Sequence, residues 1–298
     1  MSFQIPENFV QQYGNNFRML YQQRMSRLRP WCQMEGGITG QSKSVERMGA
    51  AEAYDITSRH ADTKFVEVPH SRRWIDLQDK GWAELIDKLD KVRLLADPTA
   101  GYSAMAMNAL NRATDDIILA AARGNARTNA GLSVLPSTQK IAVGGTSLTL
   151  AKLLATKEIL DSNEVDDDAS MAMDGQTANA QATRVFVVNS KMLTNLYGTT
   201  EIKSVDYNSV KALANGAIDT FMGFKFVRTE RLYRDASVTT RYGLAWSRSC
   251  VALGVGQEMS ASVDKRPDKN NAWQVFADMS IGATRLEDEG VVEVACLE

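Results

Sequence analysis

The sequence predicts an α+β fold organised around one long helix. A helical pattern continues from residue 98 to residue 123, strand-like segments fill the C-terminal third, and an extended strand-like excursion near residues 52–77 has little hydrophobic core of its own. At 1.5 Å per residue the long helix is about 39 Å in length. It has more than twice as many residues as the average helix, which has ~11–12. The 298 residues suffice for one large domain or two medium ones.

The N-terminal segment is predicted to be an amphipathic helix over residues 6–29. Pro6 suits the first helical position, apolar residues follow at nearly helical spacing, and Pro30 ends the pattern. Four arginines make the segment basic: Arg18, Arg24, Arg27 and Arg29. They are interpreted either as a solvated face, the ordinary meaning of a charge run, or as an arm that docks on a neighbouring subunit or lies near DNA.

The next segment is predicted to be an extended two-stranded hairpin. Residues 36–47 are polar and glycine-rich and indicate a loop or a weak strand. Three strand-like stretches follow, over 53–56, 63–68 and 72–77. Pro69 argues against a central strand. Because an isolated hairpin is at best marginally stable in water, this one is expected to lie on another surface, and a neighbouring subunit is the obvious candidate.

Two helices are predicted next. The first covers 82–95, and one face carries its apolar residues: Trp82, Leu85, Leu89 and Val92. The second is the long helix, with Asp97 as its N-cap and Pro98 at its first position. Gly124 is the expected C-terminal stop.

Shorter elements are predicted for the rest of the chain. Residues 125–147 are turn-rich, and Ser147 or Thr149 is expected to cap a helix over 150–161 that turns Leu150, Leu153, Leu154 and Leu160 inward. The remaining predictions are a surface loop over 163–183, a buried strand over 184–188, a short helix from Asn189 or Ser190 to Leu196, a helix over 207–214, a hairpin of 218–221 and 224–228 around Met222-Gly223, and strands over 242–254, 257–264, 273–283 and 291–297.

The sequence contains no persuasive catalytic, cofactor or metal site, so the protein is predicted not to be an enzyme. His60 and His70 are the only histidines, and His60 with Asp62 has no nucleophile elbow beside it. The run Gly144-Gly145-Thr146-Ser147 lacks the lysine of a phosphate loop and is interpreted as a turn. An acidic cluster lacks the spacing of a calcium loop and is interpreted as solvated: Glu164, Asp166, Asp167 and Asp168.

Composition limits the environment and the partners. The net charge is −2, whereas a protein that grips DNA by counterion release carries a strong basic excess, so any relation to nucleic acid is expected to be containment. Cys32, Cys250 and Cys296 form no Cys-x-x-Cys pair, which suits synthesis in a reducing cytoplasm. Neither a secretory signal nor an apolar run of the ~18 residues that a membrane span needs is present.

The order of arm, extended loop, long helix, α/β region and strand-rich end resembles the major capsid proteins of tailed bacteriophages, which have the Hong Kong 97-type fold. The resemblance begins near residue 5 and is most specific over 59–126. Its motifs are Arg59-His60-Ala61-Asp62-Thr63, His70-Ser71-Arg72-Arg73-Trp74, Leu85-Ile86-Asp87, Asp97-Pro98, Tyr102, Arg112-x-x-Asp115 and Gly124-Asn125-Ala126, then Lys211-Ala212-Leu213, Gly223-Phe224-Lys225 and Gly282-Ala283-Thr284-Arg285 before Val291-Val292-Glu293-Val294.

This resemblance implies a domain organisation and a role. Residues 1–35 would be the N-arm, 36–81 the E-loop, 82–147 the peripheral domain with its spine helix, 148–255 the axial domain, and 256–298 return strands of the peripheral domain. Hexamers and pentamers of the chain would close into an icosahedral virion shell that encloses double-stranded DNA without sequence-specific binding. The expected partners are further copies, a separate scaffolding protein, a portal and a decoration protein, with synthesis in the bacterial host cytoplasm.

Six residues near the hairpin are predicted to contact other subunits: Arg59, His60, Asp62, Arg72, Arg73 and Trp74. Tryptophan and arginine are favoured anchors of interfaces. The alternative for Trp74 is packing on the subunit's own long helix.

Two other functions compete with the capsid interpretation. An encapsulin-type nanocompartment shell has the same fold and would house enzymes instead of DNA. A soluble α+β enzyme that uses the acidic cluster or His60 would instead be a small oligomer with a deep polar pocket.

Overall fold

The computed structural model describes residues 21–59, 62–87, 99–165, 184–198, 220–237 and 239–298. The chain divides into two units. Unit 1 comprises Met1–Met25, Asp79–Arg112 and Met259–Met279, and unit 2 comprises Ser26–Gln78, Ala113–Glu258 and Ser280–Glu298. Separate helices and three mainly antiparallel sheets confirm the α+β class in the described residues.

Unit 2 contains a six-stranded sheet in the order β7-β14-β11-β8-β10-β9. Its strands are β7 (Lys140–Ile141), β14 (Val291–Leu297), β11 (Thr240–Ser247), β8 (Arg184–Val188), β10 (Phe224–Arg228) and β9 (Thr220–Phe221). The predicted strand over 184–188 is confirmed, and it is buried at every position because it lies between β11 and β10. The predicted hairpin is confirmed as β9–β10, where Met222 (φ 54°) and Gly223 (φ 86°) take the left-handed conformation of a tight turn.

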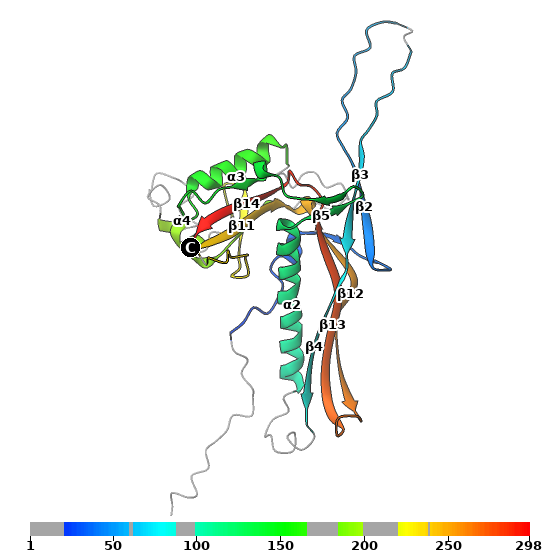
Figure 1. The fold of residues 1–298 in the computed structure, drawn as a ribbon, viewed down its shortest axis with the longest axis vertical. Coiled ribbons are helices and arrows are strands. Elements are labelled where there is room, and N and C mark those ends of the chain that lie inside the picture. Colours follow the sequence, from blue (N-terminus) through cyan, green and yellow to red (C-terminus); the bar gives the residue numbers. More distant parts are fainter. Residues whose placement is uncertain (1–20, 60–61, 88–98, 166–183, 199–219, 238) are drawn as a thin grey trace, which may run out of the picture. The chain divides into compact units, whose positions relative to one another are not determined.

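Two helices accompany this sheet, and α3 packs against β14 and β7 (Figure 1). Thr149 caps α3 (Leu150–Ser162) by accepting from the backbone N–H of Lys152. Leu153 and Leu160 are buried as predicted, but Leu154 is 50% exposed, because the residue after Leu153 projects about 100° further round the helix. The α4 helix (Ser190–Gly198) is capped by the side chain of Asn189.

Lys152 is a buried lysine on the inner side of α3. Its Nζ donates to the carbonyl oxygens of Val143 (2.8 Å), Thr146 (2.8 Å) and Ala295 (2.9 Å). Burial lowers the pKa of its ammonium group, and the nearby Cys296 works in the opposite direction. One side chain thus connects α3, the final strand β14 and the turn at Gly144-Gly145, which has positive φ at both glycines as predicted for a turn.

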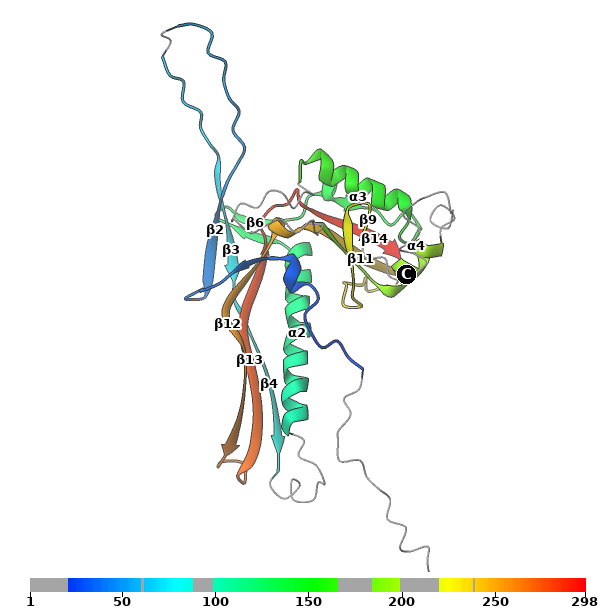
Figure 2. The ribbon, with the colours of Figure 1, turned by 180° about the vertical axis from the view of Figure 1, so that it is seen from behind.

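A second sheet of unit 2 carries the predicted hairpin. Its order is β2-β3-β5-β6, with bounds Ser42–Met48, His70–Asp76, Ala126–Thr128 and Gly131–Ser133. Pairing of β2 with β3 confirms the hairpin, but 53–56 and 63–68 are extended without being strands. The pairing stops where Gly49 donates to the carbonyl of Pro69 (2.8 Å). Figures 1 and 2 show the described residues of the intervening segment, 49–59 and 62–69, which we call the hairpin loop, extending away from the hairpin.

The third sheet has the order β1-β12-β13-β4. Its strands are β1 (Gln33–Glu35), β12 (Val251–Arg266), β13 (Ala272–Arg285) and β4 (Gln78–Ile86). The strand-rich C-terminal third is confirmed, although the strand predicted over 242–254 is interrupted by the 3-10 helix η4 (Arg248–Cys250). Asn270 and Asn271, both with positive φ, form the turn between β12 and β13.

The helix predicted over 82–95 is wrong for its described part, because residues 82–86 belong to strand β4. Trp82 and Ile86 are more buried than the residues between them, and both lie on one side of a strand with period two. Pairing with β13 therefore outweighed a helical pattern read from few apolar positions. Residues 88–95 lie outside the described part of the chain.

The long helix is confirmed as α2 (Thr99–Arg123). Its 25 residues correspond to about 38 Å. In unit 1 its N-terminal half lies beside β13 and β4 (Figure 1), with Ala106 and Leu110 buried. A Cβ at Gly124 would lie 2.6 Å from the carbonyl oxygen of Ala120, so the helix ends at the predicted glycine.

The N-terminal helix is wrong for its described residues. Residues 21–28 are irregular, and only Arg29–Trp31 form a 3-10 helix, η2. The physical reason is that the backbone N–H groups of Arg27 and Leu28 bond to the carboxylate of Asp115 instead of to helix carbonyls. Residues 6–20 and the predicted helix over 207–214 lie outside the described chain, as does most of the predicted loop over 163–183.

Candidate functional site

The predicted contact residues of β3 lie on two faces of the strand. Side chains alternate along a strand, so Arg73 and Ile75 are buried while Arg72 and Trp74 are partly exposed on the other face. The three neighbouring residues therefore do not share one surface. Only Arg72 and Trp74 remain available to another molecule.

Trp74 stands at the centre of a surface that we call the Trp74 platform, formed by Arg72, Trp74, Asp76, Arg127 and Leu132. Strand register places Trp74 opposite Arg127 and Arg127 opposite Leu132, and directly paired residues share a face of the sheet. The guanidinium of Arg127 lies 5.3 Å from the Trp74 ring centre, and that of Arg72 lies 6.0 Å from it. Leu132 is 68% exposed, so the platform combines aromatic, cationic and apolar groups.

Polar contacts hold the platform in place. The indole N–H of Trp74 donates to Oδ1 of Asn129 (3.2 Å), and Nη1 of Arg127 pairs with Oδ1 of Asp76 (2.7 Å). Arg72 pairs with Glu46 of β2. These partners come from the sheet and its turns rather than from α2, which was the alternative surface for Trp74.

Sequence reasoning missed Arg127 and Leu132. They lie on three-residue strands inside a segment that its turn residues dominate, and no periodicity can be recognised in so few positions. The available signal in the sequence was the apolar pair Leu132 and Val134, two residues apart. The structure leaves both side chains strongly exposed, at 68% and 59%.

Arg73 points into its own subunit, where it joins a cluster that we call the Asp288 junction, formed by Arg73, Ser133, Arg285 and Asp288. Arg73 Nη2 lies 2.7 Å from Oδ2 of Asp288, and Arg285 Nε lies 2.6 Å from Oδ1. Ser133 Oγ donates to Oδ2 over 2.7 Å. Burial raises the pKa of the Asp288 carboxyl, but hydrogen bonds from Arg285 and Ser133 and the two positive charges outweigh burial, so that the net pKa is lowered.

Arg285 also terminates α2. Its Nη1 donates to the carbonyl oxygens of Ala122 (3.1 Å) and Gly124 (2.6 Å), and its Nη2 to that of Ser133 (3.1 Å). A cation at a helix C-terminus satisfies carbonyls that have no intrahelical partner. The Asp288 junction therefore joins the end of α2 to β6 and to the strand that carries Trp74.

The hairpin loop is exposed along its whole described length. Arg59 and Asp62 lie on it and are exposed, while His60 lies outside the described residues. Large apolar side chains are exposed beside them: Tyr54, Ile56, Phe65, Val66 and Val68. Ile56 is 81% and Phe65 94% exposed, and apolar groups gathered on one exposed segment indicate an interaction site.

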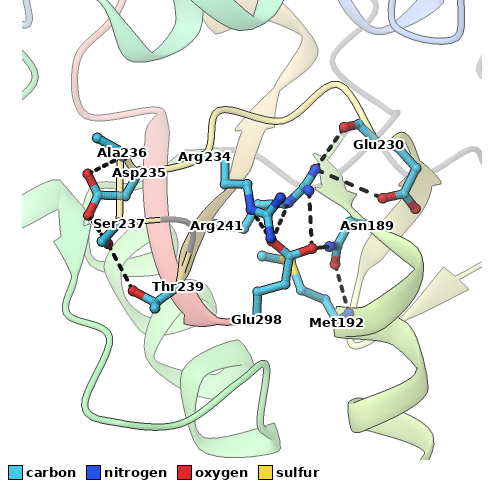
Figure 3. A network of polar contacts seen from close by, with 10 residues as sticks. All are labelled: Asn189, Met192, Glu230, Arg234, Asp235, Ala236, Ser237, Thr239, Arg241 and Glu298. Atoms are coloured by element: carbon cyan, nitrogen blue, oxygen red, sulfur yellow. Dashed lines mark hydrogen bonds and ion pairs between the residues drawn. The ribbon is translucent and has the colours of Figure 1, made fainter.

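A polar network ties together one end of the six-stranded sheet (Figure 3). The carboxylate of Glu298 lies between Arg234 (2.7 Å) and Arg241 (3.1 Å). Arg241 also donates to the carbonyl of Glu230 (2.7 Å), whose side chain accepts from the backbone N–H of Ser190 at the start of α4. The network fixes the segment between β10 and β11 against α4 and β14.

No chemical site emerges from the described residues. Among them, no group of three or more His, Cys, Asp or Glu side chains could hold a metal ion. In the same part of the chain, no helix is long and apolar enough to cross a membrane.

The three cysteines are buried and free. Burial is the main cause that raises the pKa of Cys32 and of Cys250 to about 12, and that of Cys296 to about 11. Because the thiolate is the reactive form, we expect iodoacetamide at neutral pH to leave all three unmodified in the folded subunit. Peptide mass spectrometry before and after unfolding in urea measures this, and alkylation of the folded protein at the rate of an unfolded control would contradict it.

Comparisons with known proteins give one consistent result. A family model described as phage capsid protein matches residues 5–298. The capsid of cyanophage P-SCSP1u has a TM-score of 0.74 at 14% identity, covering 97% of this chain and 93% of that chain. The search among curated proteins returns no match.

Two further solved structures agree. The capsid of Ralstonia phage GP4 has a TM-score of 0.74 at 10% identity, with 100% of this chain and 97% of that chain covered. The head structure of Helicobacter pylori bacteriophage KHP40 has a TM-score of 0.75 at 9% identity, with 99% of each chain covered. These likenesses confirm the predicted Hong Kong 97-type fold.

Proposed function

The chain belongs to the phage capsid protein family and is a structural major capsid protein of an icosahedral shell, and from this premise we propose that it assembles through hexamers and pentamers around double-stranded DNA. Contacts between unlike surfaces of identical subunits close into rings when the rotation allows it. Each subunit then touches several others, and many weak contacts together give a strong shell.

The observation that supports this assembly best is the exposed hairpin loop. Ile56 and Phe65 stand in solvent at 81% and 94% exposure, although burying one such side chain is worth about 1.5–3 kcal/mol. The described part of the loop has no strand pairing to hold it. A neighbouring subunit that covers this loop would supply the missing contacts.

The domains follow from the same proposal. The six-stranded sheet with α3 and α4 corresponds to the axial domain proposed for residues 148–255, enlarged by β7 and β14, which lie in this sheet. The rest of residues 82–147, without β7, and the strands β12 and β13 correspond to the peripheral domain, residues 1–35 to the N-arm and 36–81 to the E-loop.

The proposed relation to DNA is containment. A subunit with a net charge of −2 has no general electrostatic attraction for phosphates. A separate scaffolding protein, a portal and a decoration protein are the further proposed partners, and the bacterial cytoplasm is the proposed place of synthesis.

Negative-stain electron microscopy tests the assembly proposal. The full-length chain is expressed together with the genes that neighbour its own, with the chain expressed alone as the comparison. We expect closed particles or capsomer rings tens of nanometres across. Uniform monomers or dimers in the presence of those gene products would overturn the proposal.

The Trp74 platform is proposed to be one of the contacts between subunits. Replacing Trp74 by alanine is expected to lower the yield of closed particles at least tenfold, because tryptophan and arginine at interface centres contribute most of the binding energy. The subunit itself should remain folded, since Trp74 is only partly buried. Particle yield by sedimentation and folding by circular dichroism give the two readouts.

Arg127→Ala should act in the same direction as Trp74→Ala, because Arg127 lies over the same ring. Arg248→Ala is the matched control, since Arg248 is an exposed arginine on η4. A normal particle yield for Trp74→Ala would show that the Trp74 platform is not a contact between subunits.

A further inference from the structure

The carboxylate of Asp115 on α2 binds the chain as it leaves the N-terminal arm. Its Oδ1 accepts from the hydroxyl of Ser26 (2.6 Å) and from the backbone N–H of Leu28 (3.2 Å). The backbone N–H of Arg27 lies 3.2 Å from both carboxylate oxygens. Asp115 is fully buried, although these contacts span 87 to 89 residues of sequence.

Burial makes this contact hard to break. A buried carboxylate is costly unless it is paired or hydrogen-bonded, and hydrogen bonds to a charged group are about twice as strong as neutral ones. Leu28, the last residue of the bound segment, and Cys32, which follows it, are both fully buried. If residues 26–28 left α2, the molecule would have to expose two side chains and leave Asp115 with fewer donors.

The preceding residues are bound through their main chain as well. In unit 1, Nη1 of Arg112 donates to the side chain of Gln22 (2.7 Å) and to the carbonyl of Gln23 (3.2 Å). Asn111 donates to the carbonyl of Arg24 (3.3 Å). Main-chain groups carry no side-chain identity, so the side-chain contacts that distinguish one residue from another come from Gln22 here and from Ser26 in the segment bound to Asp115.

We propose that Asp115 is the positioning residue of the N-terminal arm: it fixes the arm at residues 26–28, so that only the part before this point reaches other subunits during assembly. This inference rests on the proposed capsid assembly for its functional consequence. It gives a role to the contacts that Arg112 and Asp115 make with the segment before Pro30, which is far from them in the sequence.

The first test measures release of the arm in the full-length, unassembled subunit. Asp115→Ala is compared with Asp116→Ala, whose carboxylate is partly exposed and pairs with Arg231. We expect trypsin to cleave after Arg27 and iodoacetamide to modify Cys32 at least tenfold faster in Asp115→Ala than in Asp116→Ala. Cys250 and Cys296 should stay unmodified in both variants, which shows that the rest of the subunit is folded. Equal rates at Arg27 and Cys32 in the two variants would overturn the inference.

The second test measures assembly. With the wild-type chain forming closed particles, Asp115→Ala is expected to give open or irregular shells at normal subunit yield, and Asp116→Ala to give closed ones. Asp115→Asn keeps one acceptor oxygen, so its proportion of closed shells should lie between those of Asp115→Ala and Asp116→Ala. It replaces Asp115→Ala if the alanine variant does not fold. Closed particles from a variant whose arm is released would overturn the positioning role. Failure of the wild type itself to assemble would overturn the proposed function, while the cleavage and alkylation results would still decide whether Asp115 holds the arm.

Discussion

Replacing Asp288 by asparagine is expected to lower the free energy of unfolding of the subunit by about 3–5 kcal/mol, the usual cost of removing one partner from a buried ion pair. Asparagine would leave the guanidinium groups of Arg73 and Arg285 buried without their counter-charge, since their side chains are 7% and 0% exposed. The urea midpoint of the unassembled subunit at pH 7 measures the loss.

The loss of stability in Asp288→Asn should depend on pH. The folded-state pKa of Asp288 is lowered from 3.8, so its ionised form stabilises the fold above about pH 3.8, and this contribution disappears as the pH falls through the lowered value. The difference between wild type and variant should therefore shrink below that pH. Asp268→Asn is the matched control, because Asp268 also pairs with an arginine but is 54% exposed; there we expect a much smaller loss, since solvent screens an exposed ion pair. A loss as small as that in Asp288→Asn would contradict the prediction.

Replacing Lys152 by methionine is expected to cost about 2–4 kcal/mol. The variant removes the donor from the carbonyls of Val143, Thr146 and Ala295, and an unsatisfied buried acceptor costs about 1–3 kcal/mol. Relief from burying the ammonium group offsets part of this loss. Thermal unfolding followed by circular dichroism gives the change in Tm.

Lys157→Met is the comparison for Lys152→Met. Lys157 lies on the same helix α3 with its side chain partly in solvent, so the same substitution should change stability by less than about 0.5 kcal/mol. If the two variants had equal Tm values, the three carbonyl contacts of Lys152 would carry no net stabilisation.

The sequence predicts those elements whose signal is local. The long helix α2 is bounded by Gly124, and the strand 184–188 is apolar at nearly every position. The left-handed turn at Met222-Gly223 depends on a glycine that the sequence displays directly. In each case the residues that determine the conformation lie within the element.

Elements decided by distant partners could not be predicted in the same way. Residues 82–86 form a strand because β13 pairs with them, and residues 26–28 are irregular because Asp115, almost 90 positions later, binds their backbone. Neither partner is visible from the segment itself.

The residues of the candidate contact site also depend on partners that are distant in the sequence. The sequence prediction placed Arg73 and Trp74 together as subunit contacts, although neighbouring residues of a strand face opposite sides and the structure buries Arg73. The carboxylate that accepts Arg73 lies 215 positions away. Arg127 and Leu132 reach the platform only through strand register, which no local pattern displays.

The burial of all three thiols makes the natural chain suitable for site-specific spectroscopy without removing any cysteine. One cysteine introduced at Lys269, in the exposed turn between β12 and β13, would be the reactive thiol against Cys32, Cys250 and Cys296. A donor dye on some copies and an acceptor dye on others would then report, by energy transfer, how far apart these turns lie as subunits associate. The kinetics of shell closure could thus be followed in solution with a protein that differs from the natural one at a single position.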